Sequence, residues 1–338
     1  MAVRDAGYDY VIVGAGSAGC VLANRLSADA TCRVLLLEAG GHADTPAIRV
    51  PALYTQLQDT ACDWADRTVP QPHLNGRRIF MPQGRVLGGS SSINYMIYIR
   101  GNPADYDRWQ QAGNPGWSYR EVLPYFIRSE TNRSFVGPYH GSDGPLIVES
   151  HPPNALVQRY LAAAQEIGIA YNPDFNGPVQ DGCGPLQATY DGRARCSAAD
   201  AYLHPARGRA NLTVLTHAQA LRLRCKGQRV TGVDYLHRGK AKRAEASIDV
   251  ILSAGAIRSP QLLLLSGIGP DEVLRRAAIA VRLHLPGVGR NLQDHLHTRV
   301  RCEITQPLSF SALGEEARDT ALRDYQLDRS GLAGSNAL

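Results

Sequence analysis

The first forty residues alternate between continuous apolar runs and a helical periodicity. Residues 8–13 form a β-rich run that is continuous enough for a strand buried in a parallel sheet. A helical pattern follows, and a second apolar run covers residues 33–38. Together these segments predict a β-α-β unit with a right-handed crossover.

The pattern changes after this unit. Residues 40–144 are irregular and rich in Pro, Gly and aromatic side chains, which in a stretch this long usually has a functional reason. Within it, Asp105 and Asp107 are expected in a solvated turn after Pro103. Two helices are predicted beyond it, 154–168 with Asn154 as N-cap and 259–266 with Pro260 in its first turn. The predicted strands are 212–215, 220–224, 230–236 and 248–252.

Composition narrows the class of protein. The 338 residues suggest about two domains, and 44% apolar with 20% charged residues is typical of a folded chain. The apolar runs fall far short of the roughly 20 residues of a membrane helix, so an integral membrane protein is excluded. The N-terminus carries no secretory pattern. Seven widely spaced cysteines without a C-x-x-C pair argue against a zinc site and a disulfide framework, and a reducing cytoplasm is expected.

The charge is mild and well mixed. The net charge is +5, from 36 basic and 31 acidic residues that are interspersed over most of the chain. Nucleic-acid binding needs a concentrated basic face. The densest basic stretch, residues 222–243, lies within apolar alternation and is interpreted as the solvated side of strands and turns. A nucleic-acid partner is therefore not expected.

A glycine-rich turn joins the first predicted strand to its helix. Residues 14–19 read G-A-G-S-A-G, the dinucleotide-binding pattern. Gly14 permits the tight turn, Gly16 lets a pyrophosphate approach the backbone, and Gly19 lets the helix pack closely on the strand. Exposed N–H groups and the helix dipole favour the anion.

Glu38 ends the second strand at the distance where this pattern expects an acid. Its carboxylate can accept hydrogen bonds from both ribose hydroxyls and would repel a 2′-phosphate, so NADP is disfavoured. The motif does not separate NAD from FAD, because both contain the same ADP half.

Residues 84–94 read G-R-V-L-G-G-S-S-S-I-N. Two glycines followed by three serines offer a backbone cradle with small hydroxyl donors, which suits a polar planar ring or a phosphate, and Asn94 adds an amide. The same residues fit a Ser-rich loop that caps a helix.

These segments together resemble the glucose–methanol–choline (GMC) oxidoreductases, FAD enzymes that oxidise alcohols. The resemblance covers residues 8–297 in the correct order. It is carried by 8–41, 84–107, 255–269 and 285–295. It implies an α/β fold with a Rossmann-like FAD domain, 1–145 and 210–304, and the beginning of an α+β substrate domain, 146–209 and 305–338.

The resemblance also implies roles for single residues. The ADP half of FAD would be held by the turn and its acid, and the pyrophosphate and isoalloxazine by the second segment. Some members attach FAD through a His, and that position is Ile93 here, so non-covalent FAD is expected. The implied cofactor residues are Gly14, Gly16, Ser17, Ala18, Gly19, Glu38, Arg85, Val86, Gly89, Asn94 and Ala220.

The implied reaction is oxidation of a primary alcohol to an aldehyde. A base takes the hydroxyl proton, the α-hydrogen leaves as hydride to flavin N5, and oxygen or a quinone-type carrier accepts the electrons. In the family the base is a His assisted by a second His or an Asn, in the C-terminal third of a longer chain. This sequence stops at Leu338, so it is expected to be an N-terminal part whose catalytic residues lie beyond that point and which is inactive alone.

Local histidines are weaker candidates for the base. His295 and His297 have the best spacing, but they belong to a segment that is not catalytic in the family and are expected to be structural or exposed. The remaining candidates are expected to be solvated; they are His140, His151, His204, His217 and His237.

Two other functions remain open. An NAD-dependent dehydrogenase would explain the β-α-β unit but not residues 84–94. A catalytically inactive FAD-binding remnant would explain both segments.

Overall fold

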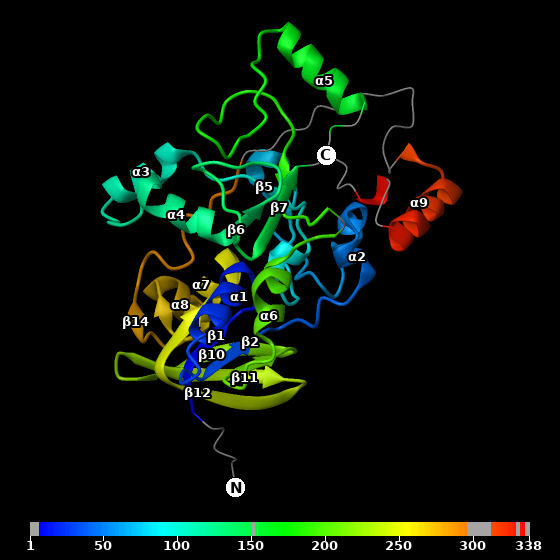
Figure 1. Cartoon of the computed structure of the whole chain (residues 1–338). Coiled ribbons are helices and arrows are strands. Elements are labelled where there is room, and N and C mark those ends of the chain that lie inside the picture. The colour runs from blue at the N-terminus through cyan, green and yellow to red at the C-terminus, as the bar shows by residue number, and fades with distance from the viewer. Residues whose placement is uncertain are drawn as a thin grey trace. The chain divides into compact units, whose positions relative to one another are not determined.

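The computed structural model describes residues 7–150, 153, 155–192, 194–295, 312–328 and 332–334. The chain divides into two compact units (Figure 1). The larger unit contains Met1–Asp44, Leu57–Ile93 and Ala198–Glu303, and the smaller one contains Thr45–Gln56, Asn94–Ser197 and Ile304–Leu338. Both units are therefore built from segments that are far apart in the sequence.

A six-stranded sheet forms the centre of the larger unit, in the order β10-β11-β12-β1-β2-β9. Strands β12, β1, β2 and β9 run parallel, whereas β10, β11 and the first half of β12 are antiparallel. The long antiparallel strands lie at the base of the view in Figure 1. The bounds are β1 Tyr8–Val13, β2 Val34–Leu37, β9 Leu212–Leu215, β10 Ala218–Lys226, β11 Arg229–His237 and β12 Lys240–Leu252.

Strand β1 is paired on both sides. Val11 lies opposite Leu35 of β2 and opposite Val250 of β12. Val11 and Leu35 are at most 1% exposed, as expected for strands covered on both faces. Helix α1, Ser17–Leu26, connects β1 to β2, so the predicted β-α-β unit is confirmed.

The helix after β12 begins earlier than predicted. Helix α7 spans Gly255–Leu265, because Gly255 has a positive φ of 82° and turns the chain directly from the strand into the helix. Pro260 consequently lies inside the helix and not in its first turn. Its Leu262 packs into the core against the sheet.

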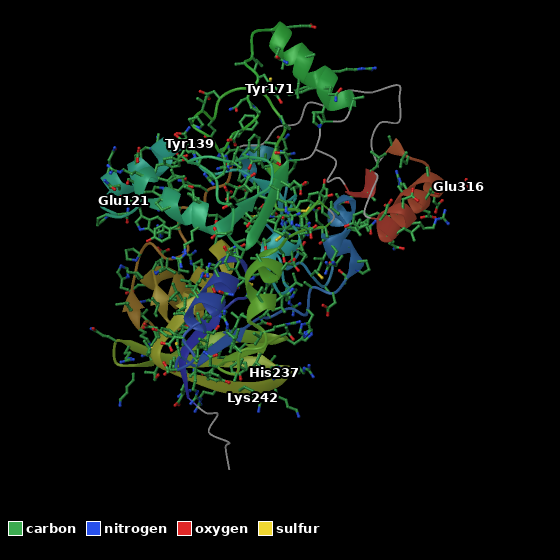
Figure 2. All side chains as sticks on the ribbon, viewed as in Figure 1. Glu121, Tyr139, Tyr171, His237, Lys242 and Glu316 are labelled. Carbon is green, nitrogen blue, oxygen red and sulfur yellow. The ribbon has the colours of Figure 1, made fainter. Side chains whose placement is uncertain are left out.

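Short elements complete the larger unit. On the long strand β12, Lys242 is exposed (Figure 2), in keeping with the solvated interpretation of the basic stretch. The short elements are β3 Asp66–Arg67, η2 Pro72–Leu74, β4 Phe80–Met81, η3 Gly89–Ser92, η4 Ala199–Leu203, α6 His204–Ala206, β13 Ile268–Gly269, α8 Asp271–Arg276 and β14 Leu283–His284.

The smaller unit contains a four-stranded sheet in the order β5-β8-β7-β6. The same unit contains the helices α2, α3, α4, α5 and α9. The strands are β5 Ile97–Tyr98, β6 Glu130–Asn132, β7 Leu146–Ser150 and β8 Gln187–Ala188; the helices are α2 Pro46–Arg49, η1 Pro51–Leu57, α3 Pro103–Gln111, α4 Tyr119–Ser129, α5 Ala155–Glu166, α9 Glu315–Asp328 and η6 Leu332–Gly334. Helix α5 confirms the predicted helix, while Asn154 lies outside the described residues.

Two helices replace part of the stretch that was expected to be irregular. Asn102 caps α3 by accepting a hydrogen bond from the Ala104 N–H, and Pro103 occupies its first turn. Ser118 and Glu121 form a capping box at α4, where Figure 2 labels Glu121. Such caps supply the partners that the first helical N–H groups lack. The expected solvated turn is therefore wrong, because it lies within α3.

His140 is the centre of a buried ionic cluster in the smaller unit, so its expected solvation is also wrong. Its ring nitrogens lie 3.1 Å from Glu130 Oε1 and 2.8 Å from Asp174 Oδ2. Arg100 forms an ion pair with the same Glu130 oxygen at 3.0 Å. The side chains of His140, Glu130 and Arg100 are at most 3% exposed. Each charge here is stabilised by a partner rather than by water.

The observed units differ from the expected domain boundaries. Residues 94–145, expected in the FAD domain, belong to the smaller unit, because β5 and β6 pair with β8 and β7. Residues 198–209 belong to the larger unit, where Tyr202 O accepts a hydrogen bond from Asn24 of α1. No helix in the described ranges has the length and apolarity needed to cross a membrane.

Candidate functional site

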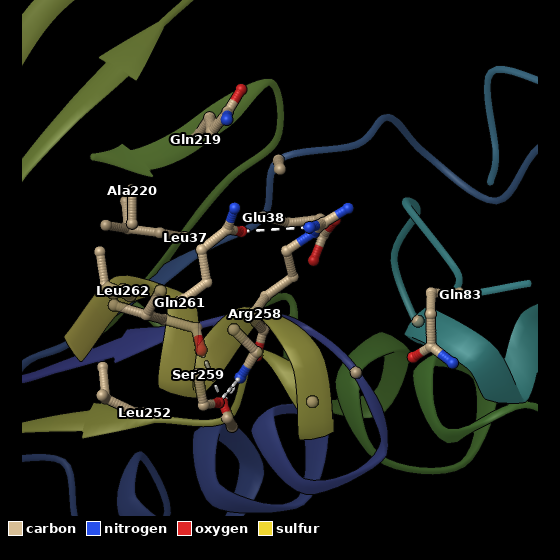
Figure 3. A pocket seen from close by; sticks show the side chains of 18 of the residues that line it. Leu37, Glu38, Gln83, Gln219, Ala220, Leu252, Arg258, Ser259, Gln261 and Leu262 are labelled. Atoms are coloured by element: carbon tan, nitrogen blue, oxygen red, sulfur yellow. Dashed lines mark hydrogen bonds between the residues drawn. The ribbon is translucent and has the colours of Figure 1, made fainter. Parts of the chain in front are cut away.

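A cavity of about 560 Å³ lies within the larger unit (Figure 3). Val13, Leu37 and Leu252, the last residues of β1, β2 and β12, all line it. Ligands of open α/β sheets bind outside the carboxyl ends of the parallel strands. The position of this cavity therefore marks it as the candidate ligand site.

The three glycines of the turn have separate structural requirements. Gly14 has φ +96°, and a Cβ there would lie 2.7 Å from Ser253 O. A Cβ on Gly19 would lie 1.9 Å from Gly14 O. Packing within the chain therefore requires glycine at both positions, in agreement with the tight turn and the close helix that the sequence predicts.

Gly16 differs from the other two. It has an ordinary φ of −76°, and a Cβ there would meet protein atoms only at 3.9 and 4.0 Å. Its own fold therefore does not require a glycine at this position. Gly16 lines the cavity, and the bare backbone leaves room for a ligand at the start of α1, where N–H groups lack helical partners.

The second glycine-rich segment packs directly on the first. A Cβ on Gly89 would lie 2.6 Å from Gly16 Cα, and the Gly88 N–H donates to Ala15 O at 2.8 Å. Gly89 and Ser90 line the same cavity. Gly84, Gly89 and Ser90 thus form one wall of the cavity, while the Ser91 and Ser92 hydroxyls donate to the carbonyls of Gly88 and Leu87 within the segment.

Glu38 lies directly after β2 and lines the cavity. Its Oε2 accepts from the Ala15 N–H at 2.9 Å and its Oε1 from the Gly40 N–H at 2.8 Å. The residue is 5% exposed. Burial raises the pKa of the Glu38 carboxyl, and these two hydrogen bonds and the charge of Arg85 only partly oppose the rise. Each carboxylate oxygen retains a second lone pair, which suits a ligand hydroxyl.

One end of the cavity is apolar. Ala220 and Leu221 of β10 and Leu262 and Leu265 of α7 line it, and Figure 3 shows Ala220 facing Leu262 across this end. Such walls suit a flat aromatic ring, and the glycine-rich turn lines the same cavity. The lining thus matches the sequence of groups in an adenine dinucleotide.

Seven of the predicted cofactor residues line this cavity, and four do not. Gly19 and Val86 are fully or almost fully buried in the packing around it. The Arg85 backbone N–H donates to Cys62 O, and its guanidinium carbon lies 5.0 Å from the Trp64 ring centre. The residues that line it are Gly14, Gly16, Ser17, Ala18, Glu38, Gly89 and Ala220.

Asn94 belongs to the smaller unit. Its Oδ1 accepts from the Met96 N–H at 3.0 Å and from Arg195 Nη1 at 2.7 Å. Arg195 Nη2 also donates to Asn94 O, and the Arg195 residue is 3% exposed. These bonds hold Asn94 in a fixed orientation within its own unit.

Sequence reasoning missed several residues of the cavity wall. Trp64, Gln83, Arg258 and Gln261 line it. Trp64 lies in the stretch that the sequence indicated as irregular, and Arg258 lies in segment 255–269, which carries the family resemblance. The sequence did offer one signal for two of them. Arg258 and Gln261 are three residues apart on a helix, the spacing at which side chains meet.

None of the candidate bases within the described residues lines this cavity, since no histidine is among its described lining residues. His295 is exposed, and its backbone N–H donates to Asp294 Oδ1. His297 and His151 lie outside the described residues.

Fold and site together define a protein of the dinucleotide-binding α/β class. The family model described as GMC oxidoreductase matches residues 8–297. The chain belongs to this family, as the resemblance of its motifs predicted.

Curated relatives and solved structures agree with this membership. An oxygen-dependent choline dehydrogenase of Photobacterium profundum is 44% identical over 97% of this chain and 59% of the relative. The crystal structure of pyridoxine 4-oxidase from Mesorbium loti is 38% identical, with a TM-score of 0.83, over 86% of this chain and 57% of that one. An FAD-dependent oxidoreductase from Chaetomium thermophilum is 29% identical, with a TM-score of 0.88, over 98% and 60%. The chain thus spans about 60% of the length of these relatives.

Proposed function

We propose that this chain binds FAD non-covalently in the cavity of the larger unit and belongs to an enzyme that oxidises a primary alcohol to an aldehyde. The observation that carries the proposal is the contact between Gly16 and Gly89, two bare backbones that face one ligand-sized cavity together with Glu38. Membership of the GMC oxidoreductases, and the FAD named for one structural relative, support the choice of cofactor.

Each part of the cavity has a distinct task in this proposal. The N–H groups at the start of α1 and the Gly16 backbone bind the pyrophosphate. Glu38 accepts hydrogen bonds from the ribose hydroxyls, and Ala220 contacts the adenine through its backbone. Arg85, Val86 and Asn94 stay assigned to the pyrophosphate and isoalloxazine side. Ile93 offers no nucleophile, so no covalent link forms at that position.

FAD supplies an acceptor for the hydride of the alcohol when it is bound. The chain's own residues orient the cofactor and exclude water from it. A base must hold the alcohol's proton, and we place it in the part of the relatives' length that this chain does not span. Oxygen or a quinone-type carrier is the proposed electron acceptor, and choline and pyridoxine, named for the relatives, are the first substrates to test.

The cofactor is tested by the absorption spectrum of the purified chain and by acid precipitation. We expect a flavin band, and FAD in the supernatant rather than on the precipitate. Flavin that stays on the precipitate would contradict non-covalent binding. Tight NAD binding without flavin would favour the nicotinamide-dependent alternative.

The activity is tested by anaerobic bleaching of the bound flavin. We expect no bleaching of the 338-residue chain by choline, pyridoxine or small primary alcohols, because a positioned base typically contributes about 10²- to 10⁴-fold in rate. The same chain extended to the length of its relatives is expected to bleach with an alcohol. Rapid bleaching of the shorter chain would place a base within it.

A further inference from the structure

A segment here called the flap, residues 59–81, borders the cavity. One buried side chain near its two ends holds these ends in place through hydrogen bonds. Asp63 is 4% exposed, and its Oδ1 accepts from the N–H groups of Ala65 and Gln83. Its Oδ2 accepts from the Asp59 N–H. The flap itself carries exposed residues, with Val69 72% exposed. A fixed base and an exposed outer part allow the flap to move as a hinged segment.

An ion pair connects the flap to helix α7. Arg258 Nη2 lies 2.6 Å from Asp66 Oδ1 and 2.8 Å from Asp66 Oδ2, across 192 residues of sequence. Its Nη1 donates to Gln261 Oε1 at 3.1 Å, and Figure 3 shows this bond above α7. The two side chains of the pair are only 20% and 24% exposed. Water screens such a pair less than it screens a surface ion pair.

The pair lies beside the cavity, because Arg258 and the neighbouring Trp64 both line it. Trp64, two residues before Asp66, lines the cavity, and Arg258 lies over its ring with the guanidinium carbon 4.3 Å from the ring centre. Arg258 itself lines the cavity from the helix side. A cation over an indole face adds attraction to the ion pair. Trp64 and Arg258 are therefore in contact with each other where both line the cavity.

Arg258 keeps one donor for a ligand. Its Nε is buried and has no hydrogen-bond partner among the described residues. An unpaired buried donor costs free energy, and a polar ligand in the cavity would remove that cost.

We propose that the Asp66–Arg258 ion pair is a latch that closes the flap over the nucleotide cavity and limits the rates of cofactor entry and release. The identity of the cofactor rests on the function proposed above. In this proposal the latch opens before FAD enters as well as before it leaves, because the flap borders the cavity in both steps.

The chain offers a matched control on the same flap. Arg67 pairs with Asp59 at 2.7 Å, and its guanidinium carbon lies 4.7 Å from the Phe80 ring centre. This pair has the same residue types and a similar aromatic contact. Both of its members belong to the flap, and their side chains are 43% and 54% exposed. Breaking it leaves the connection to α7 intact.

The rates of FAD binding and release are measured by stopped-flow flavin fluorescence in the full chain. Asp66→Asn is expected to raise both rates about tenfold with little change in Kd, since it removes a charge-assisted hydrogen bond of the latch but no side chain that lines the cavity. Asp59→Asn and Arg67→Gln are expected to stay within about twofold of the wild type. A faster release with an unchanged binding rate would show a lost ligand contact and overturn the latch.

A second readout needs no cofactor. Trp109→Phe and Trp117→Phe leave Trp64 as the only tryptophan, and acrylamide quenching then reports its exposure. We expect Asp66→Asn to raise the quenching constant and Asp59→Asn to leave it unchanged. Unchanged quenching in Asp66→Asn, which preserves the side-chain volume, would overturn the latch even if FAD binds. If the wild-type chain binds no FAD, the proposed cofactor fails, and this measurement alone decides whether the latch exists.

Discussion

Ala15 donates its backbone N–H to Oε2 of Glu38 at 2.9 Å, across 23 residues. This bond attaches the glycine-rich turn after β1 to the end of β2. The opposite oxygen of the same carboxylate accepts from the Gly40 N–H. One side chain therefore fixes two loops at the mouth of the nucleotide cavity.

Glu38→Gln is expected to weaken both the turn and the cofactor site. A glutamine keeps one acceptor oxygen, so one of the two N–H groups is left without its partner, at a cost of about 1–3 kcal/mol. FAD affinity is expected to fall about tenfold or more, because charged acceptors bind hydroxyls more strongly than neutral ones. Thermal unfolding and flavin titration check the two effects, with the exposed Glu272→Gln as control. Unchanged flavin content would contradict the ribose assignment.

Alanine substitutions should separate the glycines by function. Gly16→Ala is expected to leave the melting temperature unchanged, because its Cβ meets no protein atom closer than 3.9 Å. The methyl group would occupy ligand space, and overpacking of about 1–3 kcal/mol lowers FAD affinity about tenfold or more.

Gly14→Ala and Gly19→Ala are the matched variants. Their Cβ atoms would lie 2.7 and 1.9 Å from backbone oxygens, so both are expected to lower the melting temperature even without cofactor. Full flavin loading of Gly16→Ala would refute the pyrophosphate assignment.

The His140 cluster should give the chain a stability maximum in weak acid. Burial alone lowers the pKa of His140, but its bonds to Glu130 and Asp174 outweigh burial and raise it. Burial also opposes ionisation of Glu130, but His140, Arg100 and the Gly141 N–H outweigh it and lower that pKa.

The signs follow from linkage. The His140 contribution is fully present below its unfolded value of 6.5 and is lost as the pH rises through the higher folded value. The Glu130 contribution is present above its unfolded value of 4.5 and is lost as the pH falls through the lower folded value. Urea unfolding as a function of pH is expected to show the largest free energy of unfolding between the two unfolded pKa values, 4.5 and 6.5.

His140→Gln is expected to remove the decline above neutral pH and to cost about 3 kcal/mol, because Asp174 and Glu130 both lose their His140 partner while Glu130 keeps Arg100. His73→Gln, at an exposed position of the larger unit, is the control. An unchanged decline in His140→Gln would assign the pH dependence to other groups.

Cys20 should resist alkylation in the native protein. Burial raises the pKa of its thiol to about 12, and Sγ donates to Ala15 O at 3.2 Å. Only about one molecule in ten thousand carries the reactive thiolate at pH 8. Peptide mapping after iodoacetamide treatment is expected to show labelled Cys183, which is partly exposed, and unlabelled Cys20. Rapid native labelling of Cys20 would mean that the glycine turn opens.

Local sequence signals sufficed for the elements that carry a continuous apolar run or a clear periodicity. The β-α-β unit, β9 and α5 follow from apolar runs and periodicity, and Glu38 from its distance to the glycines. Helices α3 and α4 were not predicted: their start signals are the caps Asn102 and Ser118, and Pro124 interrupts the helical pattern inside α4.

Pairings between distant segments were not predictable in the same way. Nothing near Asp66 in sequence indicates Arg258, 192 residues away. Nothing near Asn94 indicates Arg195, which holds its side chain. Burial of His140 likewise depends on Glu130 and Asp174 meeting it through the fold. Such contacts depend on topology, which short-range patterns do not encode.

The interrupted order of the central sheet has a consequence for synthesis of the protein on the ribosome. Strand β1 is made first, yet its neighbour β12 pairs Val250 with Val11, some 240 residues later. At about 5–20 residues per second, the apolar β1–α1–β2 segment waits roughly 10–50 seconds for that partner. Closing so long a loop makes the sheet a late event in folding. Until about residue 250 has been made, the nascent chain therefore exposes the edge of β1 that later pairs with β12, and an unpaired apolar strand of this kind is prone to aggregation.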